Sequence, residues 1–319
     1  MRGVSSTDAG IGVAVTRRSQ RSSPAEIPAR SGTAGGLASK CAAVPVARRT
    51  GLLLILASVA GLVMFCWPLF ITPVTGSTGH LTDAPFAFVL VLPFLIAIVL
   101  ASFADGGMDS KALAMLGVLS AINAALRPLG AGVAGIETVF FLLVLAGRVF
   151  GPGFGFVLGC TSLFASALVT AGVGPWLPFQ MVAAAWIGLG AGLLPRRVTG
   201  RAEIAMLVAY GVAAAYFFGF LMTMFFWPFS VGTDTSVSFV PGDPLVDNLH
   251  RFFVFTVLNS SLGWDTGRAI TNALAIIVIG PAVLATLRRA SRRASFGALP
   301  TFSPTRQAVA SAGGMSTPR

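Results

Sequence analysis

Several charged and amide side chains lie within or beside long apolar stretches of this sequence. A short Gly-rich segment separates Glu137 from Arg127, and Arg268 and Asn272 are four residues apart, so they share one face of a helix. An ionisable side chain inside a lipid bilayer is unfavourable unless it is paired or hydrated, which makes it a functional candidate by default. An ion pair between Arg127 and Glu137 would lower the cost of burying both. It would either join two helices or also face a ligand.

Aromatic and amide side chains are expected at the same depth. Trp176 and Gln180 stand at the start of one apolar stretch, while Asn259, Trp264 and Asp265 precede another. Tryptophan is also common at the lipid–water interface, so the two indoles have an alternative explanation. A pocket with aromatic walls and a few fixed polar groups suits a small organic ligand. The predicted ligand-binding residues are Arg127, Glu137, Trp176, Gln180, Asn259, Trp264, Asp265, Arg268 and Asn272.

The composition places these groups in a lipid environment. Hydrophobic residues make up 55% of the 319 residues and charged residues only 10%, with a mean hydropathy of +0.83. A water-soluble domain carries about 25% charged residues. Because roughly 20 apolar residues cross the bilayer as a helix, the sequence predicts an all-α, polytopic membrane bundle of about eight spans. The predicted spans are residues 51–71, 85–104, 112–127, 133–149, 153–171, 178–195, 202–229 and 266–287.

The ends of the chain differ from this apolar region. Residues 1–47 are rich in Ser, Ala, Gly and Arg and have no apolar period, which predicts a disordered cytoplasmic tail, and residues 291–319 are predicted to form another. Between them we predict two N-terminal transmembrane helices within 48–110 and a six-helix domain over 111–290. The apolar segment 249–262 is too short to cross, so we predict an interfacial or re-entrant piece there.

The net charge of +11 does not indicate nucleic-acid binding. The basic residues gather in the tails and at span ends, where the positive-inside rule places them. With eight spans the basic clusters all fall on one side, which predicts a multi-pass plasma-membrane protein with both termini in the cytoplasm. The clusters are Arg48 and Arg49, then Arg196, Arg197 and Arg201, and then Arg288, Arg289, Arg292 and Arg293.

Small residues recur every four positions in three of the apolar stretches. A four-residue period keeps a row of side chains on one face of a helix, and such rows let helix backbones approach closely in lipid. Each row could serve packing within one bundle or form a docking face for another membrane subunit. The rows are Gly117, Ala121 and Ala125; Gly151, Gly155 and Gly159; and Ala184, Gly188 and Gly192.

No catalytic, metal-binding or cofactor-binding motif is recognisable in the sequence. The three cysteines form no CxxC motif or Cys/His cluster, and there is no Walker A loop, GxSxG motif or HExxH motif. We therefore expect no catalytic residues, no metal and no cofactor. Two alternatives to solute binding stay open. One is an intramembrane enzyme acting on a lipid or isoprenoid, with Glu137 or Asp265 as the acid, and the other is a membrane scaffold protein.

Four segments form a distinctive combination. They are Asn-Ala-Ala-Leu-Arg-Pro at 123–128, the Gly/Pro-rich stretches at 140–155 and 172–181, and the segment 261–272 around Trp-Asp-Thr-Gly-Arg. Together they resemble the substrate-binding (S) components of energy-coupling factor (ECF) transporters, which are vitamin-uptake relatives of ABC importers. The last segment looks like the final-helix region of actinobacterial members.

The resemblance implies a six-helix S-component fold that binds a vitamin-like ligand without catalysing a reaction. It implies a transmembrane coupling subunit and two cytoplasmic ATPases as partners, and a mechanism in which the S component topples in the membrane to carry its ligand inward. It also implies that Gly117, Ala121 and Ala125 dock the coupling subunit. The two N-terminal spans depart from the family's minimal pattern. Within the family, the sequence looks closest to members assigned to cobalamin or a related precursor.

Overall fold

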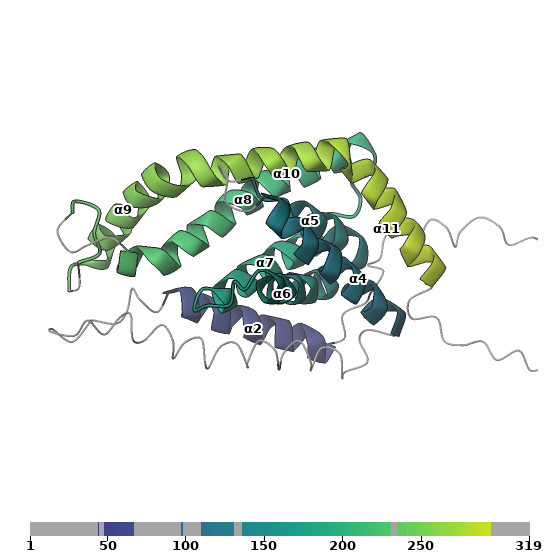
Figure 1. The fold of residues 1–319 in the computed structure, drawn as a ribbon, viewed down its shortest axis with the longest axis horizontal. Helices are drawn as coiled ribbons and strands as arrows, with labels where there is room; N and C mark the ends of the chain where they lie inside the picture. The colour runs from purple at the N-terminus through teal and green to yellow at the C-terminus, as the bar shows by residue number, and fades with distance from the viewer. Residues whose placement is uncertain are drawn as a thin grey trace, which may run out of the picture. The chain divides into compact units, whose positions relative to one another are not determined.

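The computed structural model describes only part of the chain (Figure 1). The predicted span 85–104 lies outside the described residues except for Ala97, as does the tail at 1–47 except for Val44. Of the tail predicted at 291–319, residues 291–294 are helical, which corrects the prediction there, and the remainder lies outside the described residues. The described residues are Val44, 48–66, Ala97, 110–130, 136–230, 235–240 and 242–294.

Every regular element among these residues is helical, which confirms the predicted all-α class. The elements are α2 (Arg48–Cys66), α4 (Ser110–Leu126), the 3-10 helix η2 (Arg127–Gly130), α5 (Val139–Phe150), α6 (Pro152–Val169), α7 (Leu177–Leu193), α8 (Arg201–Ser230), α9 (Leu245–Thr256), the π-helix η3 (Val257–Asp265), α10 (Thr266–Val278) and α11 (Gly280–Ala294). By length and composition, α6 and the part of α8 at 201–227 can each cross a membrane, while α2, α4, α5 and α7 are shorter apolar helices.

Helix α5 lies at the centre of the bundle. All 12 of its residues are buried, and it contacts α4, α6, α7, α8, α10 and α11 (Figure 1). A helix that is apolar on every side is expected to be enclosed on every side. Helix α5 fits this description apart from Arg148, its one charged residue, which lies in its last turn. Charged groups at its two ends are therefore separated by the length of a short apolar helix, about 18 Å.

Two of the three small-residue rows pack helix α6 directly against helix α7. A Cβ atom built on Gly155 would overlap the carbonyl oxygen of Gly188, and one on Gly159 would lie 2.5 Å from the backbone of Ala184. Gly192 meets the start of α6 in the same way. These rows therefore serve packing within the bundle, because only residues without a larger side chain allow this approach.

The third row faces outward. Gly117, Ala121 and Ala125 are all exposed on α4, and a Cβ atom on Gly117 would meet no described atom within 4 Å. The same helix is attached to α6 through its other side, where Asn123 donates to the Ser162 hydroxyl at 3.1 Å. Close helix packing within the described chain therefore does not account for the row on α4.

The C-terminal helices differ from the prediction. The segment 249–262 is not a separate re-entrant piece, because α9, η3 and α10 follow one another without a break from Leu245 to Val278 alongside α8. The predicted span at 266–287 is not straight, since the chain bends by 64° between Val278 and Gly280, as in a broken span or a re-entrant loop. Pro281 explains the bend: its nitrogen carries no hydrogen, and its ring displaces the preceding turn. Counting apolar length alone missed that the segment 263–268, with its polar residues Asp265, Thr266 and Arg268, continues the helix.

The glycine contacts between α6 and α7 give a stability prediction. Gly188→Ala should lower the melting temperature of the purified protein, corresponding to a loss of about 1–3 kcal/mol, because its methyl group meets backbone that cannot rotate away. Gly117→Ala is the matched control and should leave the melting temperature unchanged or slightly raised. Equal effects of the two changes would contradict the packing described here.

Candidate functional site

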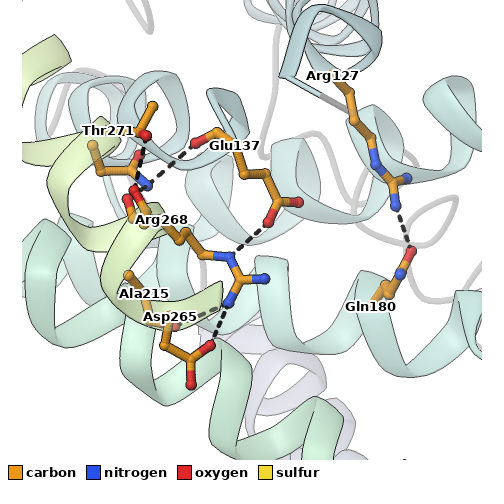
Figure 2. Close-up of polar contacts among 9 residues, drawn as sticks. Arg127, Glu137, Gln180, Ala215, Asp265, Arg268 and Thr271 are labelled. Atoms are coloured by element: carbon orange, nitrogen blue, oxygen red, sulfur yellow. Dashed lines mark hydrogen bonds and ion pairs between the residues drawn. The ribbon is translucent and has the colours of Figure 1, made fainter. Parts of the chain in front are cut away.

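Arg268 is the centre of a charged cluster inside the bundle (Figure 2). Its Nε donates to Oε2 of Glu137 at 2.6 Å, and its Nη1 donates to Oδ1 of Asp265 at 2.8 Å. Nη1 also lies 3.4 Å from the carbonyl oxygen of Ala215 in α8. The arginine thus connects the segment before α5, the middle of α8 and the start of α10, with Glu137 131 residues away in the sequence.

Two phenylalanines cover the guanidinium of Arg268. The Arg268 Cζ lies 5.0 Å from the ring centroid of Phe218 and 5.7 Å from that of Phe140. An aromatic face attracts a cation, and the attraction is stronger where water is excluded. The exposed fraction of the Arg268 side chain is 11%, and that of Glu137 is 20%. The ion pair is therefore largely, but not completely, removed from solvent.

Neighbouring residues hold the cluster in place. The Asn272 side chain is fully buried and donates to the carbonyl oxygen of Arg268 at 2.8 Å and to that of Glu137 at 3.4 Å. A Cβ atom on Gly219 would overlap the Asp265 carboxylate, so α8 has a glycine where this side chain needs room. Asp265 ends the π-helix, and π-helical turns occur frequently at functional sites.

Arg127 has a different partner from the one we expected. Its Nη2 donates to Oε1 of Gln180 at 2.8 Å, joining η2, which directly follows α4, to the first turn of α7 (Figure 2). The predicted Arg127–Glu137 ion pair is therefore wrong, because Glu137 pairs with Arg268 instead. Glu137 still attracts Arg127 electrostatically. Local spacing suggested the nearer arginine, whereas the tertiary fold brings Arg268 closer.

Three further predicted site residues, Trp176, Trp264 and Asn259, are not among the hydrogen-bonded contacts described above. Trp176 and Trp264 are exposed, with exposed fractions of 38% and 46%. Asn259 belongs to the π-helix, but its side chain lies outside the described residues. The structure thus brings together Glu137, Asp265, Arg268 and Asn272 in one hydrogen-bonded cluster, and Arg127 and Gln180 as a second pair.

A second charged cluster, at the other end of α5, was missed by the sequence analysis. Nε of Arg148 donates to Oε1 of Glu203 at 2.7 Å, and Nη2 of Arg288 donates to the same oxygen at 2.6 Å. Arg148 also donates to the carbonyl oxygens of the α7–α8 loop at 2.9–3.1 Å; these belong to Leu194, Pro195 and Val198. The one signal in the sequence was an arginine within an otherwise apolar helix.

The charges of the first cluster and of Arg127 cancel. Glu137 and Asp265 carry two negative charges, and Arg268 and Arg127 carry two positive ones. Nη2 of Arg268 and Oε1 of Glu137 form no hydrogen bond with any of the described residues. One donor and one acceptor are therefore available side by side on a neutral group of four charged residues. The described residues contain no group of three His, Cys, Asp or Glu side chains suited to hold a metal.

Apolar helices around a charged, hydrogen-bonded cluster define a helical membrane protein. Residues 111–290, more than half of the chain, match the family described as ECF transporter, substrate-specific component. The chain belongs to this family, so it is a transport binding subunit of the membrane and not an enzyme. Members bind a substrate and associate with an ECF module. A search of curated proteins and one of solved structures found no match.

The pairing of Arg268 gives a second stability prediction. Glu137→Gln should destabilise the protein by about 2–3 kcal/mol, because it removes a charge that balances a nearly buried guanidinium. Thermal unfolding in detergent measures the change. Asp243→Asn breaks the more exposed Arg251–Asp243 pair and should cost no more than about 1 kcal/mol. A Glu137→Gln variant as stable as this control would show that the cluster does not support the fold.

Proposed function

We propose that this chain captures a vitamin-like solute at the cluster around Arg268 and hands it to an ATP-driven coupling module. The observation that carries this proposal is the unused donor and acceptor, Nη2 of Arg268 and Oε1 of Glu137, beside a second polar pair, Arg127 and Gln180. Trp176 and Trp264, as exposed indoles, would supply apolar contact area, and Asn259 would belong to the same site.

The balance of charge favours a neutral ligand. A net charge brought into a site whose own charges cancel would have no counter-ion there, and an unpaired buried charge is strongly unfavourable. A carboxamide has one oxygen that accepts and an N–H that donates, which complements Arg268 Nη2 and Glu137 Oε1. Cobalamin and its late precursors carry side-chain carboxamides, so this arrangement supports a ligand of that type.

The exposed row on α4 is the proposed docking face for the coupling subunit. Gly117, Ala121 and Ala125 leave a flat stripe on a membrane helix, and helices in lipid associate where small side chains permit close approach. The remaining partners would be two cytoplasmic ATPases. In the proposed topology the chain lies in the plasma membrane with both termini in the cytoplasm, and the Arg268 cluster faces the outer side.

Ligand binding tests the proposal directly. The isolated chain, purified from vitamin-replete cells, should retain a small molecule that mass spectrometry identifies, and it should bind added cyanocobalamin. Arg127→Gln should weaken that binding about tenfold, since one charge-assisted hydrogen bond is worth about 1.4 kcal/mol or more. Arg251→Gln, in the separate pair with Asp243, is the matched control. Absence of any retained or added vitamin in the folded chain would refute the proposal.

Docking is tested independently of ligand binding. Ala121→Leu should abolish co-purification with the coupling subunit and ATP-dependent uptake, because the larger side chain prevents close helix contact, yet it should leave ligand affinity within about twofold. Ala213→Leu makes the same change at an exposed position of α8 and should preserve both activities. A complex that still assembles with Ala121→Leu would rule out this face.

A further inference from the structure

Helix α11 has an unusual position for the end of a membrane bundle. It turns away from α10 by 64°, so it does not continue the direction of the preceding helix. Its buried residues are Gly280, Leu284 and Leu287, and it packs against α5, where Gly280 approaches Leu145. One face of α11 is therefore attached to the apolar core while the remainder is exposed.

The exposed part of α11 is strongly basic. Arg289, Arg292 and Arg293 are exposed, and Arg288 is 42% exposed while it pairs with Glu203. Arg288 and Arg292 are four residues apart, as are Arg289 and Arg293, and like charges at this spacing repel each other on a helix. An anion bound across these positions would relieve that repulsion.

Other elements bring further positive charge to the same end of the bundle. Nζ of Lys111, at the start of α4, donates to the carbonyl oxygen of Ala294 at the end of α11 at 2.9 Å. Arg148 holds the α7–α8 loop beside Glu203 and Arg288, and that loop carries Arg196 and Arg197. Within the part of the chain that the structure describes, Glu203 is the acidic side chain at this end, and Arg148 and Arg288 share its charge.

We propose that α11 and its surroundings form a binding site for the headgroup of an anionic phospholipid. The ends of a bundle that spans a bilayer lie at the depth of the headgroups, and basic clusters next to a membrane helix attract anionic lipids. An amphipathic helix with arginines beside an apolar face binds such a surface with its axis near the membrane plane. Guanidinium groups suit phosphate because they can donate two parallel hydrogen bonds.

The site has a structural consequence. The same carboxylate, Glu203, joins Arg288 of α11 to Arg148 of α5, and a phosphate held by Arg289 and Arg293 would offset the repulsion between these two arginines beside that link. Lipid occupancy would therefore stabilise this end of the bundle, which lies at the opposite end of α5 from the Arg268 cluster. The inference does not depend on the identity of the transported solute.

The test compares two lipids on the full-length chain in a neutral detergent. Phosphatidylglycerol and phosphatidylcholine are titrated separately, and native mass spectrometry measures the bound lipid while thermal unfolding measures stability. We expect selective binding of phosphatidylglycerol with a raised melting temperature. The double variant Arg289→Gln/Arg293→Gln should lose about 30-fold of this selectivity. Arg251→Gln, a matched change in the separate Arg251–Asp243 pair, should keep it.

Several outcomes would overturn the proposal. Equal binding of the two lipids, or unchanged selectivity in the double variant, contradicts a headgroup site on α11. If the double variant binds both lipids as the wild-type protein does but no longer co-purifies with the ATPases, the surface belongs to a protein partner instead. If the double variant does not fold, the salt dependence of lipid binding by the wild-type protein tests the proposal. A selectivity for phosphatidylglycerol that does not fall as NaCl rises from about 0.05 to 0.5 M excludes an electrostatic site.

Discussion

The pairing of Arg268 is the interaction on which the rest of the bundle depends. A guanidinium between two phenylalanine rings inside apolar helices must have anionic partners, because burying an unpaired charge is far more unfavourable than any single packing contact. Glu137 and Asp265 meet this need. Since one comes from the segment before α5 and the other from the end of the π-helix, balancing the charge also fixes how these helices are arranged.

Helix α5 separates two charged clusters whose arginines differ in the hydrogen bonds that they make. At one end Nη2 of Arg268 and Oε1 of Glu137 form no hydrogen bond with the described residues, while at the other all three guanidinium nitrogens of Arg148 donate to Glu203 or to loop carbonyl oxygens. An arginine that donates four hydrogen bonds, as Arg148 does, holds α5, α8 and the loop between α7 and α8 together. A partly satisfied one can still exchange contacts with a solute, and this contrast supports placing the binding site at the Arg268 end.

The three rows of small residues have the same pattern in the sequence and different surroundings in the structure. Gly155 and Gly188 meet backbone to backbone, so the rows on α6 and α7 are used within the bundle. Gly117 meets nothing in the described chain. In a membrane, where apolar helices gain little from leaving lipid, an exposed stripe of small residues permits close approach of another helix, which is the basis of the docking face proposed here. Which row is left exposed depends on the packing of α4 and not on its composition.

The sequence by itself determined the helical membrane class, the family resemblance and most of the charged residues of the candidate site. Few polar groups occur in so apolar a chain, and because each is costly inside a membrane, each is a candidate for a structural or functional role. It could not determine their partners. Arg127 was assigned to Glu137 by proximity in the chain, whereas the fold brings Glu137 to Arg268 from 131 residues away and gives Arg127 to Gln180. The cluster of Arg148, Glu203 and Arg288 and the bend before α11 also became visible only in three dimensions. Residue types limit which charges need compensation, but the choice of partner depends on which helices lie side by side, and only the tertiary structure decides that.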